Sequence, residues 1–65
     1  MSKIGVKIKR LREKRGWTQE ALAKKAGVNL VTVGRIEAEM RKTPTLETRK
    51  KLARALGVSI VELLE

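Results

Sequence analysis

Few side chains in this sequence are suited to catalysis or to metal binding. The chain contains no histidine and no cysteine, so the commonest general base, the commonest metal ligand and any catalytic thiol are missing. Its seven acidic residues are scattered, and no glycine-rich phosphate-binding loop is present. We therefore expect no catalytic residues, no metal site, no cofactor and no small-molecule substrate, and the sequence argues against an enzyme.

Positive charge is the strongest chemical feature of the chain. Sixteen Lys and Arg residues stand against seven acidic ones in 65 residues, which gives a net charge of +9. Such a field attracts polyanions, although a basic surface that only confers solubility is the alternative. A membrane-surface protein would need aromatic anchors beside its basic residues, and the chain has one Trp and no Phe or Tyr. The composition therefore favours a nucleic acid as the partner, with no membrane.

The length of the chain predicts a single domain, 1–65, with a small core. No apolar run approaches the roughly 18 residues that a membrane span requires. The first residues, MSKIGVKIKR, lack the apolar block of a secretory signal. We therefore expect a cytoplasmic location, at the nucleoid.

Glycines and capping residues divide the chain into short segments. Gly16, Gly27 and Gly57 each follow a helical pattern, and a Ser, Thr or Asn precedes each of the last four predicted helices. No segment alternates with a period of two, so the predicted fold class is all-α, a compact five-helix bundle. The predicted helices are at about 4–15, 19–26, 30–40, 46–56 and 60–64.

Apolar residues at helical spacing predict the core of this bundle. Trp17 and Val28 stand at loop edges and should fill gaps between helices. The predicted core residues are Ile4, Ile8, Leu11, Leu22, Ala23, Ala26, Val33, Ile36, Leu52, Ala53, Leu56, Ile60, Leu63 and Leu64.

The segment NLVTVGRIEAEM, residues 29–40, has two helical sides that are both poor in charge. One side carries Val33, Ile36 and Met40. The other carries Leu30, Val31, Gly34, Arg35 and Ala38. A domain of this size can bury only one side of the helix, so the second side is predicted to serve a partner.

The similarity of the chain to a known family lies in three stretches, GWTQEALAKKAGVN, RIE and TPTLETRKKLARALGVSIVELL. They resemble the phage-repressor and Cro class of helix-turn-helix proteins, also called the Xre family. The resemblance runs from about residue 4 to residue 64 and implies a lambda-repressor-like fold. It also implies a transcription regulator that binds double-stranded DNA, as a monomer or a homodimer, with its third helix in the major groove.

The resemblance gives the interface residues their expected roles. Arg12 and Glu37 match a family pair that forms a partly buried salt bridge between the first and third helices. The residues implied to face the bases are Asn29, Leu30, Val31, Gly34 and Arg35. Those implied to contact phosphates are Thr18, Gln19, Arg41, Lys42 and Thr43.

Several of these positions have a second interpretation. Arg35 suits guanine O6 and N7, but an exposed salt bridge with Glu39, four residues on, is the alternative. Leu30 and Val31 suit thymine methyl groups, but they also suit a protein partner. Gly34 would let the helix approach a base edge, or it is simply a tolerated glycine.

The chain departs from the family pattern after RIE, where Ala38 and Glu39 replace an expected Asn-Gly pair. The missing glycine stop predicts that the third helix continues to Met40 or Arg41. These departures are compatible with a redesigned member aimed at a chosen DNA site, as well as with a thermophile or phage regulator. A protein-interaction module of the same fold, such as an antitoxin or a bridging factor, is the alternative function.

Overall fold

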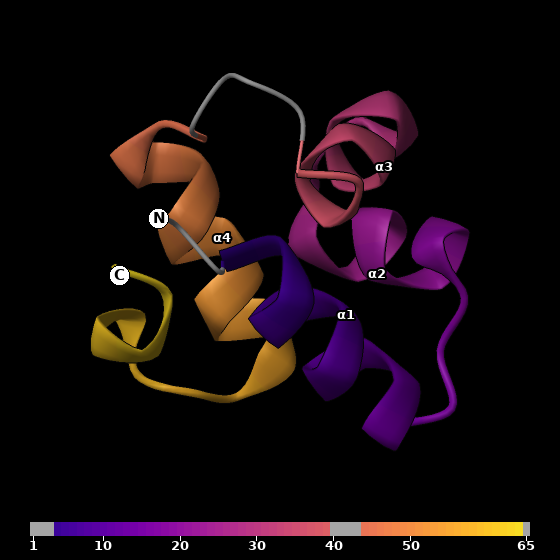
Figure 1. Ribbon diagram of the computed structural model, residues 1–65, viewed down its shortest axis with the longest axis horizontal. Helices are drawn as coiled ribbons and strands as arrows, with labels where there is room; N and C mark the ends of the chain where they lie inside the picture. The colour runs from indigo at the N-terminus through magenta and orange to yellow at the C-terminus, as the bar shows by residue number, and fades with distance from the viewer. Residues whose placement is uncertain (1–3, 40–43, 65) are drawn as a thin grey trace.

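Helices are the only regular secondary structure in residues 4–39 and 44–64, the ranges that the computed structural model describes (Figure 1). The elements are α1 (Ile4–Lys14), α2 (Gln19–Ala26), α3 (Leu30–Glu37), α4 (Leu46–Leu56) and the short 3-10 helix η1 (Ile60–Leu63). The predicted all-α class is therefore confirmed, with a 3-10 turn as the fifth element. No helix in these ranges has the length and apolar character needed to cross a membrane.

Local capping explains where most of these helices begin and end. Four side-chain oxygens accept a backbone N–H from the first turn of the helix that follows, and they belong to Thr18, Asn29, Thr45 and Ser59. Gly27 and Gly57 end α2 and α4 with φ of 71°, in the left-handed region that glycine adopts at no steric cost. The bounds predicted for α2 and α4 are therefore the observed ones.

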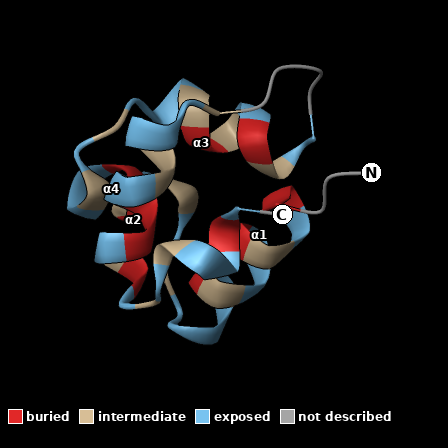
Figure 2. Cartoon of the chain, turned by 90° about the vertical axis from the view of Figure 1, so that its left-hand side faces the viewer, coloured by how far each residue is buried: buried red, intermediate tan, exposed pale blue. Residues whose placement is uncertain are grey.

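The core lies where the four α-helices and η1 face one another, and their buried sides all point inward (Figure 2). The largest fully buried side chains are Ile8, Leu22, Val33, Leu52, Leu56 and Leu63. Trp17 and Val28 are partly buried against this core, as the sequence predicted. The prediction for Leu64 was wrong, because its side chain is 47% exposed. A 3-10 helix has three residues per turn, so Ile60 and Leu63 share the inward side and Leu64 does not.

The end of α3 also differs from the prediction. The helix stops at Glu37, and Ala38 is its C-cap, rather than continuing to Met40 or Arg41. Glu39 then adopts φ of 57°, and its N–H donates to the carbonyl oxygen of Ile36 at 3.0 Å. A glutamate thus takes the left-handed position that glycine was expected to fill. Met40 and Arg41 themselves lie outside the described residues.

The end of α3 packs closely against α1. Gly5 is buried and lies so close to the end of α3 that a Cβ atom there would overlap the carbonyl oxygen of Ile36. The same Cβ would lie 2.9 Å from Cγ of Glu39. The sequence prediction missed this contact, although a glycine between Ile4 and Val6 in a helical turn was a usable signal.

The tryptophan connects the end of α1 to the rest of the domain. Two cations lie over its ring, with Arg15 at 5.8 Å and Lys25 at 4.9 Å from the ring centroid. The Arg15 guanidinium also donates to the carbonyl oxygens of Leu11 and Leu56, which joins α1 to the end of α4. Arg15 and Lys25 thus have structural contacts within the domain.

Candidate nucleic-acid interface

The turn at residues 27–29 joins α2 to α3 and sets α3 on the outside of the domain, against α1 and α2 (Figure 1). On the inward side of α3, Val33 and Ile36 are buried. On the outward side, Leu30 is 45% exposed and Val31 is 55% exposed. The two sides predicted from the spacing are therefore distinct in the structure.

An ion pair ties α3 to α1. Nε of Arg12 donates to Oε2 of Glu37 at 2.6 Å, and Nη2 donates to Oε1 at 2.9 Å. Nη1 of Arg12 donates to the backbone oxygen of Trp17 at 2.7 Å. The two charged side chains are only 10% and 3% exposed, so each depends on the other for a counter-charge. The pair expected from the resemblance is present, and it fixes the inward side of α3 to the body.

Gln19 completes this arrangement, which the sequence did not reveal. Its Nε2 donates to Oε1 of Glu37 at 3.0 Å, so the carboxylate accepts from α1 and from α2 at once. The side-chain oxygen of Gln19 would lie 3.8 Å from a Cβ atom at Gly34. The structure therefore brings Gln19, Gly34 and Glu37 together at the junction of α2 and α3. Side-chain pairing of this kind depends on tertiary packing, and no local signal in the sequence indicates it.

The ionisation of Glu37 reflects these contacts. Burial by itself raises the pKa of this carboxyl group. Hydrogen bonds from Arg12 and Gln19, together with the charges of Arg12 and Lys9, outweigh burial and hold the pKa of Glu37 below its ordinary value of 4.5. The hydrogen bond to Glu37 likewise raises the pKa of Arg12, against the effect of burial. The pair is therefore fully charged at neutral pH.

We expect acid to destabilise the domain through Glu37. Its folded pKa lies below its unfolded pKa, so its contribution is complete above the unfolded value and is lost as the pH falls through the folded value. The free energy of unfolding, measured by urea titration from about pH 7 to about pH 2, should therefore fall below about pH 4.5. The variant Glu37→Gln should be less stable at neutral pH but should lose less in acid. If both proteins lose the same free energy of unfolding in acid, titratable groups other than Glu37 cause the loss.

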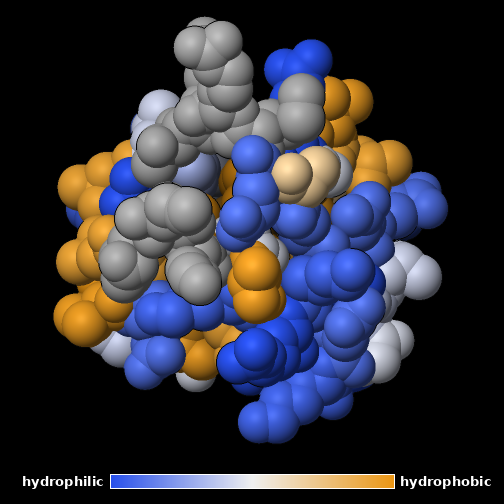
Figure 3. Space-filling model, in the orientation of Figure 1, coloured by the Kyte–Doolittle hydropathy of each residue, from blue (hydrophilic) through white to orange (hydrophobic). Residues whose placement is uncertain are grey.

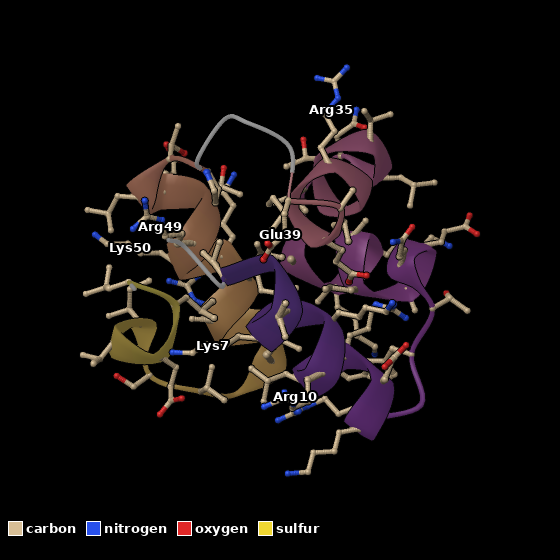
Figure 4. The ribbon with its side chains drawn as sticks, viewed as in Figure 1. Lys7, Arg10, Arg35, Glu39, Arg49 and Lys50 are labelled. Atoms are coloured by element: carbon tan, nitrogen blue, oxygen red, sulfur yellow. The ribbon has the colours of Figure 1, made fainter. Side chains whose placement is uncertain are left out.

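Arg35 extends from the outward side of α3, away from the body of the domain (Figure 4). Glu39 lies apart from it, over Gly5 of α1. Because α3 ends at Glu37, Glu39 is not one helical turn above Arg35 on the same side of a helix. Among the ion pairs of the described residues, none joins Arg35 to Glu39. The alternative of an exposed Arg35–Glu39 salt bridge is therefore not supported.

The two capping residues keep groups available for a ligand. Oγ1 of Thr18 accepts the N–H of Ala21 at 3.0 Å, and its hydroxyl proton remains a donor. Oδ1 of Asn29 accepts the N–H of Val31 at 2.7 Å, so the amide nitrogen is the group of Asn29 that can donate outward. The remaining predicted phosphate contacts, Arg41, Lys42 and Thr43, lie outside the described residues.

Apolar atoms gather on the surface over α3, at the upper right of the space-filling view (Figure 3). A second apolar area lies over the start of α4 and η1, where Leu46, Val61 and Leu64 are exposed. Within the described ranges, no cluster of acidic side chains could hold a metal ion. The exposed chemistry of α3 is thus one arginine beside an apolar pair.

Known proteins share the sequence pattern of this chain. Residues 8–63 match the helix-turn-helix family. The chain is 34% identical over 62 residues to the HTH-type transcriptional regulator SinR of Bacillus subtilis. The matched region covers 95% of this chain and 56% of SinR. It is 39% identical over 61 residues to the uncharacterized HTH-type transcriptional regulator y4dJ of Sinorhizobium fredii, across 94% of this chain and 78% of that protein. The chain thus spans little more than half the length of SinR.

Solved structures agree with the sequence comparison. The N-terminal DNA-binding domain of SinR from Bacillus subtilis superimposes with a TM-score of 0.89 at 34% identity, over 95% of this chain and 90% of that one. A chain from the complex of SinR with SinI gives the same TM-score of 0.89, over 95% of this chain and 60% of that one. The fold predicted from the sequence is therefore confirmed at the level of the whole arrangement of helices.

Proposed function

The chain belongs to the helix-turn-helix family, and on that premise we propose that it is the DNA-binding domain of a transcriptional regulator. It recognises a short duplex site by placing α3 in the major groove. Its relatives SinR and y4dJ are named as transcriptional regulators, in agreement with the prediction that the chain is not an enzyme. Duplex DNA as the partner would place it in the cytoplasm, at the nucleoid.

The observation that carries this proposal is the two-sided anchoring of α3. Val33, Ile36 and the Arg12–Glu37 ion pair hold one side of the helix to the body. The other side presents Arg35, extended and exposed, to a partner. An arginine in the major groove can donate two hydrogen bonds to O6 and N7 of guanine, so Arg35 is proposed as the hydrogen-bonding reader of the site.

Phosphate contacts would come from the start of α2. Backbone N–H groups and the helix dipole favour an anion at that end, where Thr18 and Gln19 lie. The hydrogen bond to Glu37 orients the Gln19 carboxamide. The carboxylate of Glu37 would therefore serve both the ion pair that stabilises the fold and the positioning of Gln19 for a phosphate. We propose Arg41, Lys42 and Thr43 as further phosphate contacts. Each phosphate neutralised should contribute about −0.9 to the slope of log affinity against log salt concentration.

A protein-interaction module is the second candidate function. Exposed Leu46, Val61 and Leu64 form an apolar area away from α3, and SinR is known in a complex with SinI. The same area would serve a homodimer on DNA, while a monomer would read one half-site. Sedimentation with and without duplex DNA distinguishes these states.

Arg35→Ala tests the proposed readout. We first expect wild-type protein to select a preferred site from a pool of randomised duplexes. On that site, fluorescence anisotropy should show Arg35→Ala losing about 1–3 kcal/mol of binding free energy, with relaxed preference at one base pair. Arg10→Ala is the matched control, because Arg10 is also exposed but lies at the opposite end of the view from Arg35 (Figure 4). Its loss should be small and the same for every sequence.

Two results would contradict this proposal in different ways. If Arg35→Ala weakens binding to every duplex equally, Arg35 is a phosphate contact rather than a base contact. If wild-type protein itself binds all duplexes alike, sequence-specific readout by α3 is wrong.

A further inference from the structure

Leu30 and Val31 form an exposed apolar pair at the first turn of α3. They are 45% and 55% exposed, and they follow directly on the Asn29 cap. The cap holds the backbone of this turn, because Oδ1 of Asn29 accepts the N–H of Val31 at 2.7 Å. The pair is therefore presented in a fixed geometry rather than on a loose chain end.

Few hydrogen-bonding groups accompany this pair on the outward side of α3. The oxygen of Asn29 is occupied by its capping role, which leaves its amide nitrogen as a donor, and Gly34 has no side chain. Arg35 is the principal donor at the positions expected to face the bases. Base recognition by this side therefore adds apolar contact to a small number of hydrogen bonds.

Gly34 is a glycine that the fold does not require. It is not among the glycines with positive φ, and the nearest atom that a Cβ would meet is Oε1 of Gln19 at an ordinary 3.8 Å. Glycine is nevertheless less favourable than alanine inside a helix. Gly34 lies one turn after Leu30 and Val31 on the same side, so its bare backbone permits a close approach of that side to a groove.

We infer that Leu30 and Val31 read the C5-methyl groups of pyrimidines, so that the domain accepts 5-methylcytosine as well as thymine at the base pairs facing them. The C5-methyl group of thymine is the one apolar group that a base presents in the major groove, and methylation of cytosine puts a methyl group at the same ring position. The inference rests on the proposed function. The +9 charge of the chain, and Arg35 one helical turn after Val31 on α3, favour a DNA-borne apolar group over a second protein.

The test replaces each thymine of the selected duplex, one at a time, with deoxyuridine, which lacks only the methyl group. At one or two neighbouring positions the affinity of wild-type protein should fall about 4-fold, because the complex no longer buries one methyl group. At those positions, a cytosine–guanine pair should also weaken binding. Methylation of that cytosine at C5 should then raise the affinity again by about 4-fold.

Two variants assign the effect to the apolar pair. Leu30→Ser and Val31→Ser should fold normally, because both side chains are exposed, and each should lose discrimination between thymine and deoxyuridine at one position. Val6→Ser is the matched control. Val6 is likewise an apolar side chain that is 44% exposed, but it lies on α1. It should keep the wild-type discrimination in full.

The possible failures are distinguishable. Sequence-specific binding without any deoxyuridine penalty would overturn methyl reading and leave the proposed function standing. Equal binding of all duplexes would overturn both. If Leu30→Ser and Val31→Ser keep the discrimination and instead abolish self-association in sedimentation, the pair is a protein contact and the inference is wrong.

Discussion

Arg12→Ala is expected to cost about 3–5 kcal/mol of folding free energy, because it leaves the charge of Glu37 buried without its counter-charge. The Glu37 side chain is 3% exposed, and Gln19 alone would remain as a hydrogen-bond donor to its carboxylate. A domain of this length has a total stability of about 3–10 kcal/mol, so the variant should lose a large share of it. Urea titration at neutral pH, followed by circular dichroism, measures the loss.

A double variant separates the stranded charge from the value of the pair itself. Arg12→Met combined with Glu37→Leu removes both charges and keeps similar side-chain volumes, and replacing a buried ion pair in this way is often neutral or stabilising. We expect it to recover most of the stability that Arg12→Ala loses. Arg10 is exposed on the same helix, so Arg10→Ala should change the free energy of unfolding little. If the double variant is as unstable as Arg12→Ala, the cost arises from interactions that both proteins lose, such as the hydrogen bond from Arg12 to the backbone oxygen of Trp17, rather than from the unpaired carboxylate.

Gly5→Ala is expected to destabilise the domain by about 1–3 kcal/mol or more, the usual range for overpacking a well-packed site. The new Cβ would overlap the carbonyl oxygen of Ile36, which is backbone and cannot swing aside, and would press on Cγ of Glu39 at 2.9 Å. The start of α1 would therefore have to move away from the end of α3. The shift in the urea midpoint at constant slope measures this cost.

Gly34→Ala is the control for this prediction, because it makes the same chemical change where the new Cβ would meet no close neighbour. The Cβ of the new alanine would meet only Oε1 of Gln19, at 3.8 Å. Alanine is favoured over glycine inside a helix by about 1 kcal/mol, so Gly34→Ala should be stabilising. Stabilisation by both variants would mean that helix propensity, and not the contact with Ile36, determines the outcome at Gly5.

Local signals in the sequence were sufficient for the elements that carry caps at both ends. The helices α2 and α4 begin after a threonine and end at a glycine, and their predicted bounds match the structure. The end of α3 could not be predicted in this way. It lies against Gly5 of α1, which is distant in sequence, and Glu39 adopts a left-handed conformation that its residue type does not favour.

The candidate interface was predicted only in part, for a similar reason. The Arg12–Glu37 pair followed from the resemblance to a family, and the structure contains it. The hydrogen bond from Gln19 to Glu37 was not foreseen, because it depends on how α2 lies against α3. The alternative pairing of Arg35 with Glu39 assumed a continuous helix, and it failed when that helix proved shorter.

The position of Trp17 gives the domain an intrinsic optical reporter. It is the only tryptophan of a chain that has no tyrosine, so ultraviolet-excited emission arises from this one indole ring. The ring packs against the core, with Arg15 and Lys25 over it. The backbone oxygen of Trp17 accepts a hydrogen bond from Arg12. Loss of these neighbours on unfolding changes the surroundings of the ring, while α3 carries no aromatic side chain. Emission of the unlabelled protein therefore follows folding at the Arg12–Glu37 pair separately from events on the outward side of α3.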